Sequence, residues 1–295
     1  MSSSPYAGVG TALVTPFKED GSVDHKRYAE FIDWQIGQGI NFIVPLGTTG
    51  ETPALTEEED VEVARTALET AQGRVPVLVG CGSNDTAAII ERATRFKALG
   101  VTHILSVSPY YNKPNQEGIY QHFKAIRNQT GLEIMLYNIQ GRTGSNVEPE
   151  TVARMFEEGI IFGVKEASGS LIQIQKTHQL TGDGFQIFSG DDAMTQAVMA
   201  VGGVGVICTS SNAIPKPIIE WVDTLRAGDY VKGAQLLKPL LPVFEAFFTE
   251  PNPIPVKAAC SLLGLMDARY RLPMVPPEEK TIQLVREVMR PFHKL

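Results

Sequence analysis

Eight repeats of a short apolar run followed by a segment of helical periodicity predict an α/β fold, a (β/α)8 TIM barrel with a small C-terminal helical domain. The repeat is about 25 residues long, and strict alternation of strand and helix implies parallel strands with right-handed crossovers. No glycine-rich nucleotide loop follows the first strand, which argues against the competing doubly wound sheet. We expect residues 1–228 to form the barrel and residues 229–295 the helical domain.

The predicted strands are apolar and rich in β-branched residues. They span 10–17, 40–47, 75–80, 103–109, 134–138, 160–167, 185–190 and 204–209. The helices between them carry start and stop signals. Thr56 and Glu59 have capping-box spacing, Pro149 suits a first helical turn, and Gly100 ends the helix that starts near Asp85.

After about Gly228 the alternation of strand and helix stops. The rest of the chain is predicted to form helices separated by proline-rich turns. These helices span 230–248, 256–263 and 277–290. No long linker precedes them, so we expect this small domain to pack against the barrel.

The composition excludes several classes of protein. Hydrophobic residues make up 43% and charged residues 20%, as in a globular protein, and the net charge of −7 argues against binding to nucleic acid or an anionic membrane. No signal peptide or apolar run of about 18 residues is present, so a cytoplasmic location is expected. The 3 cysteines are predicted to be free and buried, and the spacing of the 5 histidines does not suit a metal site.

Polar side chains gather where the predicted strands end, and in this architecture chemistry takes place at the C-terminal ends of the strands. No Ser–His–Asp set occurs there. The candidates at these ends are Thr48, Thr49, Tyr110, Tyr111, Tyr137, Arg142, Lys165, Glu166 and Asp191.

Lys165 is the most informative of these candidates because it follows a run that is typical of a buried parallel strand. Burial penalises an ammonium, so the pKa of Lys165 is expected to fall. A free amine is what attacks a ketone to form a Schiff base. Two alternatives are that the side chain extends to solvent or that it pairs with Glu166.

The neighbouring strand ends could complete such a site. Tyr137 could relay protons or could simply cap a core with its hydroxyl. Thr48 and Thr49, between two glycines, could bind a carboxylate through backbone N–H groups or form a plain turn. Arg142 could clamp a second carboxylate or remain solvated in its loop. Together these residues indicate Schiff-base chemistry on a small anionic keto acid, with neither metal nor organic cofactor.

Five motifs in barrel order resemble the dihydrodipicolinate synthase / N-acetylneuraminate lyase family of pyruvate-dependent class I aldolases. They are GTTGE at 47–51, PYYNKP at 109–114, YN at 137–138, GVKEA at 163–167 and SGDD at 189–192. The segments EPNPIPVK at 250–257 and RLPM at 271–274 are similar to the synthase branch in particular. The resemblance extends along essentially the whole chain.

The resemblance implies a role for each site residue. Lys165 would condense with pyruvate, Thr48 and Thr49 would hold its carboxylate, and Tyr137 would shuttle protons through Thr48 to Tyr111. Tyr111 would reach into the neighbouring subunit's site, which implies a homotetramer built as a dimer of dimers. Gly190 and Ile207 would line the pyruvate pocket with their backbones. Arg142 would bind the carboxylate of L-aspartate-4-semialdehyde.

The implied reaction joins pyruvate, as a lysine Schiff base and then an enamine, to L-aspartate-4-semialdehyde and gives 4-hydroxy-tetrahydrodipicolinate for lysine and diaminopimelate biosynthesis. Two alternatives stay open: cleavage or synthesis of N-acetylneuraminate or a 2-keto-3-deoxy sugar acid, and a catalytically silent barrel that binds a keto acid.

The chain departs from the family at two places. Gln140 stands where proline is usual, beside Arg142, which leaves the second substrate open. Ala88 replaces the carboxylate that would pair with the ammonium of inhibitory lysine. We therefore expect weak or absent inhibition by lysine.

Overall fold

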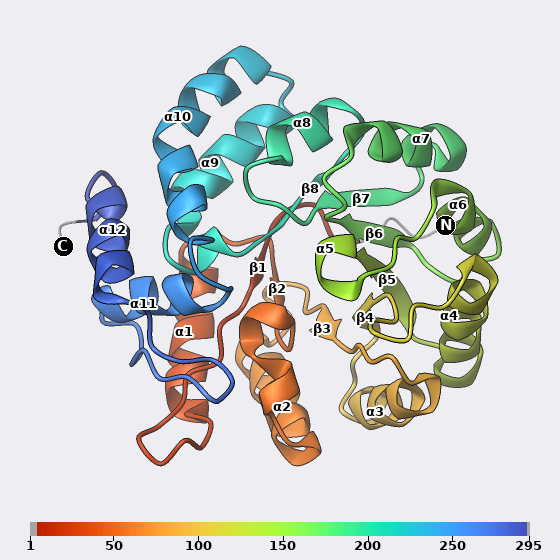
Figure 1. Cartoon of the computed structure of the whole chain (residues 1–295), viewed down its shortest axis with the longest axis horizontal. Coiled ribbons are helices and arrows are strands. Elements are labelled where there is room, and N and C mark those ends of the chain that lie inside the picture. Colours follow the sequence, from red (N-terminus) through yellow and green to blue (C-terminus); the bar gives the residue numbers. More distant parts are fainter. Residues whose placement is uncertain (1–4, 294–295) are drawn as a thin grey trace. The chain divides into compact units, whose positions relative to one another are not determined.

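A computed structural model describes residues 5–293 and contains an eight-stranded sheet (Figure 1). The strands are β1 (Gly8–Ala12), β2 (Phe42–Val44), β3 (Val79–Gly80), β4 (His103–Val107), β5 (Glu133–Asn138), β6 (Gly163–Glu166), β7 (Gln186–Ser189) and β8 (Gly205–Cys208). Their order is β2-β1-β8-β7-β6-β5-β4-β3, and the strand pairs with a defined register are parallel, as predicted.

Helices separate the strands as the sequence predicts. They are α1 (His25–Gly37), α2 (Glu57–Ala71), α3 (Thr86–Ala98), α4 (Gln116–Thr130), α6 (Pro149–Glu157), α7 (Leu171–Thr181), α8 (Thr195–Ala200) and α9 (Pro215–Arg226). The helices after the last strand are α10 (Tyr230–Ala246), α11 (Ile254–Leu262) and α12 (Glu279–Met289). The capping box of α2 forms as predicted, with the Thr56 hydroxyl accepting from the Glu59 N–H and the Glu59 carboxylate accepting from the Thr56 N–H.

The first strand is shorter than predicted, because a side chain takes over its hydrogen bonds. The Asn212 amide nitrogen donates to the Ala12 carbonyl at 2.7 Å, and its oxygen accepts from the Val14 N–H at 3.1 Å. These bonds satisfy the backbone where a neighbouring strand would otherwise be needed. Strand β1 therefore ends at Ala12, although the apolar pattern continues to residue 17.

Four short helical turns were not predicted from the sequence. They are η1 (Thr48–Gly50), η2 (Thr52–Ala54), α5 (Gln140–Thr143) and η3 (Ser210–Asn212). Three of them, η1, α5 and η3, begin within four residues after the ends of β2, β5 and β8. Segments of 3 or 4 residues are too short for a hydrophobic period to show, so the sequence pattern could not reveal them.

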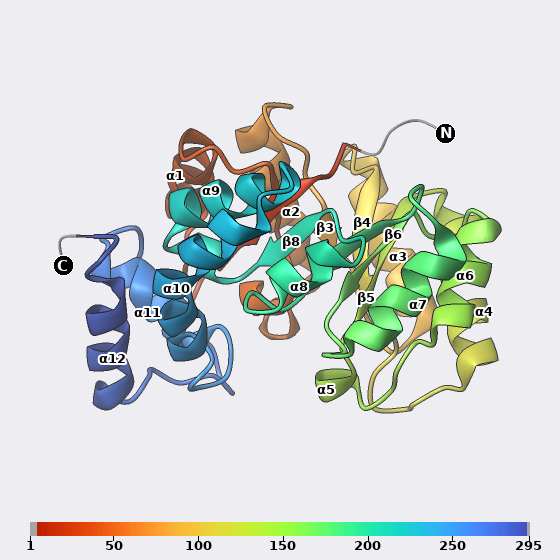
Figure 2. The same cartoon turned by 90° about the horizontal axis from the view of Figure 1, so that it is seen from above.

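The described chain divides into two compact units, and the first is built on Leu78–Ile207. Helices α3, α4, α6 and α7 lie around the strands β4, β5 and β6 in both views (Figures 1 and 2). The strands are buried, apart from partly exposed residues at their ends. Close packing of β6 against β7 requires Gly163, because a Cβ there would lie 2.6 Å from the Gln186 carbonyl oxygen.

The second unit comprises Tyr6–Val77 and the chain from Cys208 onward. It joins β1, β2, α1 and α2 to the C-terminal helices α9–α12. Its core includes the buried side chains of Tyr28, Phe31, Trp221 and Phe247. The domain boundary at residue 228 that we predicted from the sequence stays a prediction.

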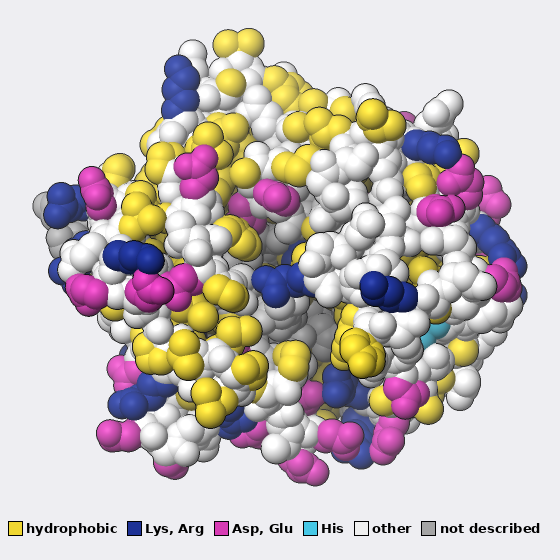
Figure 3. Space-filling model, in the orientation of Figure 1, with side chains coloured by type: hydrophobic (Ala, Val, Ile, Leu, Met, Phe, Trp, Pro, Cys, Tyr) yellow, Lys and Arg dark blue, Asp and Glu magenta, His cyan; other side chains and the backbone are white. Residues whose placement is uncertain are grey.

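The surface of the described residues is mixed in charge. On the face shown in Figure 3, acidic and basic side chains are interspersed. No helix within residues 5–293 is long and apolar enough to span a membrane. The 3 cysteines, at positions 81, 208 and 260, are buried and free, as predicted.

Candidate active site

The first unit places Lys165 and Tyr137 side by side. They are register partners on the adjacent strands β6 and β5, and the Lys165 Nζ lies 4.3 Å from the centroid of the Tyr137 ring. Lys165 is 7% exposed and Tyr137 is 8% exposed. The alternative in which Lys165 extends into solvent is therefore wrong.

Glu166 is directed away from Lys165, because successive side chains of a strand point to opposite faces. Its carboxylate accepts hydrogen bonds from Ser168 N at 2.7 Å and from the side chains of Asn138 and Gln173 at 3.1–3.3 Å. Burial raises the pKa of Glu166, while these donors lower it. The carboxylate next to Lys165 in sequence is thus held by other groups.

Gly190 lies beside the lysine and makes room for it. A Cβ at Gly190 would lie 3.2 Å from the Lys165 Cε and 2.9 Å from the Ala167 Cβ, which is closer than normal packing allows. Gly190 and Ile207 each follow by one residue the register pair Ser189 and Val206 of β7 and β8. Ile207 is buried. The lining role of both residues stays a prediction.

Tyr137 keeps its proton at neutral pH. Burial raises the pKa of its phenol to about 12; the Arg142 guanidinium lowers it and the carboxylates of Asp192 and Asp191 raise it. A phenol that stays protonated can donate a hydrogen bond or a proton to an oxygen atom beside Lys165.

Arg142 lies on the short helix α5 and is exposed. The helix is closed by Thr143, whose hydroxyl donates to the carbonyls of Ile139 and Ser145, and by Gly144 with φ of +75°. Gln140 is its first residue, a position where the N–H has no intrahelical partner and proline is also favoured. Gln140 is therefore compatible with the start of this helix.

Tyr111 is 88% exposed, and its φ is +72°. Hydrogen bonds that hold the loop include those from Tyr111 N to the Thr143 carbonyl at 3.3 Å and from the Asn112 side chain to the Asn84 carbonyl at 3.0 Å. A bulky residue in the left-handed region is uncommon and points to a constrained loop. Within the first unit, this aromatic ring is presented outward.

In the second unit, Thr48 and Thr49 open the turn η1. Gly50 N and Glu51 N donate back to the carbonyls of Gly47 and Thr48, and the first amides of such a turn have no intrahelical acceptor. Thr48 is exposed, whereas Thr49 is buried and its hydroxyl accepts from the Asn252 side chain at 2.9 Å. The two threonines thus have different surroundings, which the sequence did not indicate.

A buried ion pair follows this turn. The Lys257 Nζ donates to Glu51 Oε1 at 2.7 Å, and both side chains are nearly inaccessible to solvent. The same ammonium lies 4.0 Å from the centroid of the Phe17 ring. Burial lowers the pKa of Lys257 to about 8, against the opposing influence of Glu51. The pair links the segment after η1 to helix α11.

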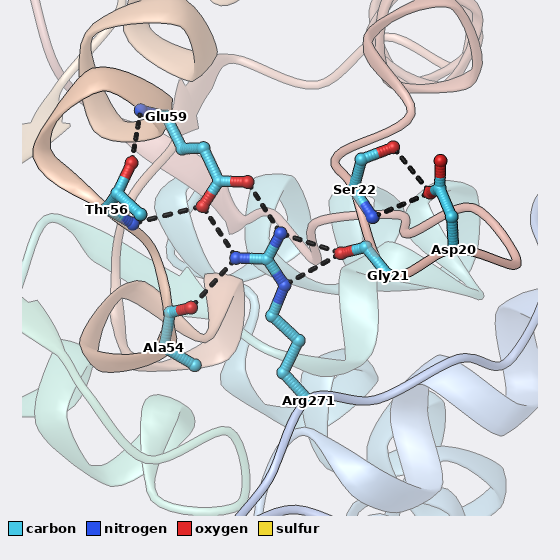
Figure 4. A network of polar contacts seen from close by, with 7 residues as sticks. All are labelled: Asp20, Gly21, Ser22, Ala54, Thr56, Glu59 and Arg271. Carbon is cyan, nitrogen blue, oxygen red and sulfur yellow. Dashed lines mark hydrogen bonds and ion pairs between the residues drawn. The ribbon is translucent and has the colours of Figure 1, made fainter.

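Arg271 joins the same region through all of its side-chain nitrogens (Figure 4). It makes two bonds of 2.6 Å to the Glu59 carboxylate and donates to the carbonyls of Gly21 and Ala54. Glu59 also caps helix α2 at Thr56. Arg271 thus binds the C-terminal segment to the start of α2.

The sequence predicted no role for Asn252, Lys257 or Arg271, although all three lie in the segments 250–257 and 271–274 that are similar to the synthase branch. One signal was available for Lys257, which is a charged residue within an otherwise apolar helix. The partners Glu51 and Glu59 are about 200 residues away along the chain, and no local pattern could have identified them. Among the described residues, no group of three or more His, Cys, Asp or Glu side chains could hold a metal ion.

The chain is similar to known proteins over nearly its whole length. The model of the dihydrodipicolinate synthetase family matches residues 5–291. A 4-hydroxy-tetrahydrodipicolinate synthase of Koribacter versatilis is 47% identical over 276 residues, which cover 92% of each chain.

Solved structures agree with this similarity. A dihydrodipicolinate synthase from Thermotoga maritima has a TM-score of 0.95 at 41% identity and covers 98% of this chain and 99% of its own. The enzyme from Acinetobacter baumannii, solved in complex with pyruvate, has a TM-score of 0.94 at 37% identity and covers 96% and 98%. The predicted (β/α)8 barrel with C-terminal helices is confirmed by this likeness. The match extends from residue 5 to residue 291 and so covers nearly all of the described residues, and the chain belongs to the dihydrodipicolinate synthetase family.

Proposed function

We propose that this chain condenses pyruvate with L-aspartate-4-semialdehyde to give 4-hydroxy-tetrahydrodipicolinate, in lysine and diaminopimelate biosynthesis. The observation that carries the proposal is the buried Lys165 amine, 4.3 Å from the ring centroid of Tyr137 on the next strand. The names of the relatives support the reaction, and the pyruvate complex of the Acinetobacter baumannii enzyme supports the first substrate.

In the proposed mechanism the neutral Lys165 amine attacks the ketone carbon of pyruvate. The carbinolamine loses water and becomes an iminium ion, which makes the methyl protons acidic because the nitrogen accepts the electron pair. Loss of one methyl proton gives an enamine, whose carbon attacks the aldehyde of the second substrate. The amine of that substrate then attacks the iminium carbon, closes the ring and releases Lys165.

Tyr137 is proposed to donate the proton that converts the carbinolamine hydroxyl into departing water, and to be reprotonated afterwards. Its phenol is suited to the role because its pKa of about 12 keeps it protonated. Thr48 and Thr49 are proposed to hold the pyruvate carboxylate through the backbone N–H groups at the start of η1. The fixed hydroxyl of Thr49 supports this proposal, because it orients the turn.

Arg142 is proposed to bind the carboxylate of the aldehyde substrate. An exposed guanidinium on a short, closed helix can form a bidentate pair with a carboxylate. Gly190 and Ile207 are proposed to line the pyruvate pocket with their backbones, and the close approach of Lys165 to Gly190 supports this.

We also propose a homotetramer, a dimer of dimers, in which Tyr111 enters the site of a neighbouring subunit. The 88% exposure of this aromatic ring supports the proposal, because a single chain leaves it uncovered. A cytoplasmic location is proposed because the 3 cysteines are free and buried, as is usual in a reducing compartment.

The test is a coupled assay of the purified chain with pyruvate and L-aspartate-4-semialdehyde, beside pyruvate and N-acetylmannosamine. We expect turnover of pyruvate with the semialdehyde and no turnover of pyruvate with N-acetylmannosamine. In Arg142→Ala, the KM for the semialdehyde should rise about 10-fold or more, because a bidentate charged contact is lost, while borohydride trapping of pyruvate persists. Turnover with N-acetylmannosamine, or a KM that Arg142→Ala leaves unchanged, would contradict the assignment of the second substrate.

A further inference from the structure

A second register pair follows the Tyr137–Lys165 pair. Asn138 and Glu166 are the next residues of β5 and β6, and they are partners across the two strands. Both side chains are buried. Because side chains alternate along a strand, they lie on the opposite face of the sheet from Tyr137 and Lys165. They therefore lie behind the site, on the face of the sheet that is turned away from Lys165.

The Glu166 carboxylate is surrounded by hydrogen-bond donors. Oε1 accepts from Ser168 N at 2.7 Å and from Asn138 Nδ2 at 3.3 Å, and Oε2 accepts from Asn138 Nδ2 at 3.1 Å and from Gln173 Nε2 at 3.2 Å. An ionised carboxylate accepts at both oxygens and donates nothing, which matches this arrangement. An amide in its place would turn an NH2 group toward one of these donors.

The same network reaches the segment that follows Arg142. Asn138 Oδ1 accepts from Val147 N at 3.1 Å, and Asn138 Nδ2 donates to Asn146 Oδ1 at 3.0 Å. The side chains of Asn146 and Gln173 exchange two further hydrogen bonds, at 2.8 and 3.1 Å. Through these bonds the buried Glu166 carboxylate is connected to Asn138 on the neighbouring strand β5. It is also connected to residues 146 and 147, which follow helix α5.

We infer that Glu166 is a positioning residue, which acts with Asn138 and Gln173 to hold Tyr137 and Lys165 at reacting distance and to fix the segment that carries Arg142. The inference rests on the proposed function. Geometry of this kind matters for catalysis, because a displacement of about 1 Å between reacting groups can lower a rate about 100-fold. Hydrogen bonds behind the reacting residues are what limit such displacements.

The first experiment compares the wild type with Glu166→Gln in the full condensation assay. We expect kcat to fall about 10-fold or more, while the KM for pyruvate changes less than about 3-fold. The rate of borohydride trapping of pyruvate on Lys165, per folded molecule, should fall in parallel. The double variant Glu166→Gln/Gln173→Glu returns one carboxylate to the network and should recover part of the trapping rate.

Two further variants separate positioning from folding. Gln173→Ala changes a half-buried helix residue, so it should fold, and it should lower the trapping rate about 2- to 5-fold. Glu133→Gln removes a carboxylate from the other end of β5, where it pairs with Arg127, and should leave kcat unchanged. Circular dichroism and thermal unfolding determine the folded fraction of each variant.

The outcomes distinguish this inference from the proposed function. An inactive wild type would overturn the proposed function. The positioning role would be overturned if the wild type is active and both Glu166→Gln and Gln173→Ala keep the full kcat and the full trapping rate. A lower melting temperature with unchanged trapping per folded molecule would also overturn it, because that result is what a purely structural role predicts.

Discussion

Among residues 5–293, each of the two compact units buries one lysine, and the two lysines differ in what surrounds them. Lys257, in the second unit, lies on a helix and donates to the Glu51 carboxylate at 2.7 Å. Lys165, in the first unit, lies on a strand above the ring of Tyr137, and the adjacent carboxylate of Glu166 is bonded to Asn138, Ser168 and Gln173.

The comparison shows that burial of a lysine does not by itself identify a nucleophile. A carboxylate at hydrogen-bond distance stabilises the ammonium and commits Lys257 to a structural ion pair. At Lys165, the sheet turns the nearest carboxylate in sequence to its opposite face. Gly190 has no side chain, which allows the Lys165 side chain to pass close to its backbone.

The largest expected effect is the loss of activity in Lys165→Arg. A guanidinium cannot form the Schiff base, so kcat should fall by about 1,000-fold or more. Borohydride trapping with pyruvate, followed by peptide mass mapping, should place the adduct on Lys165 in the wild type. Lys176→Arg, at an exposed lysine, serves as the control and should keep full activity. An adduct on Lys257 instead would show that Lys257, and not Lys165, is the nucleophile.

The second effect concerns stability. Lys257→Met leaves the Glu51 carboxylate buried without its partner and should lower the free energy of unfolding by about 3–5 kcal/mol at pH 7. Urea unfolding measures this change. The double variant Lys257→Met/Glu51→Gln also removes the charge of the Glu51 carboxylate and should recover part of the lost free energy of unfolding. If the single variant unfolds at the same urea concentration as the wild type, Lys257 has no structural role of this kind.

The third effect is a pH dependence of the same ion pair. Burial lowers the pKa of Lys257 from 10.5 to about 8, so between these values the unfolded chain keeps a proton that the folded chain releases. Stability therefore rises with pH across this window, and the contribution is lost as pH falls toward 8. The stability difference between the wild type and Lys257→Met should therefore widen as the pH rises from 8 to 10.5. If this difference instead becomes smaller, the pKa of Lys257 is raised by Glu51 more than it is lowered by burial.

The smallest effect concerns free lysine as an inhibitor. Its ammonium would need a carboxylate, as Lys257 has Glu51, and the resemblance predicts that Ala88, exposed on α3, stands where this carboxylate would be. We expect weak or no inhibition, because such a charge pair contributes about 1–3 kcal/mol. The condensation assay at increasing lysine concentrations measures this, and Ala88→Glu should strengthen any inhibition. A sub-millimolar inhibition constant would contradict the prediction.

The fold was largely predictable from the sequence because each strand–helix unit carries local signals. The capping box at Thr56 and Glu59 and the proline at position 149 act within one turn of helix. The end of β1 was not predictable, since it depends on Asn212, some 200 residues away along the chain. The turns η1 and α5 were missed because 3 or 4 residues are too few for a helical period to repeat.

By itself, the sequence determined the order of the strands and helices, the burial of the strand that contains Lys165, and the set of polar residues at the strand ends. These properties follow from periodicity and residue type, which act over a few neighbouring residues. Only the tertiary structure decided that Lys257 pairs with Glu51, and which groups hold Glu166 and Thr49. Hydrogen bonds and ion pairs of that kind depend on distances of about 3 Å between distant parts of the chain, which no local pattern encodes.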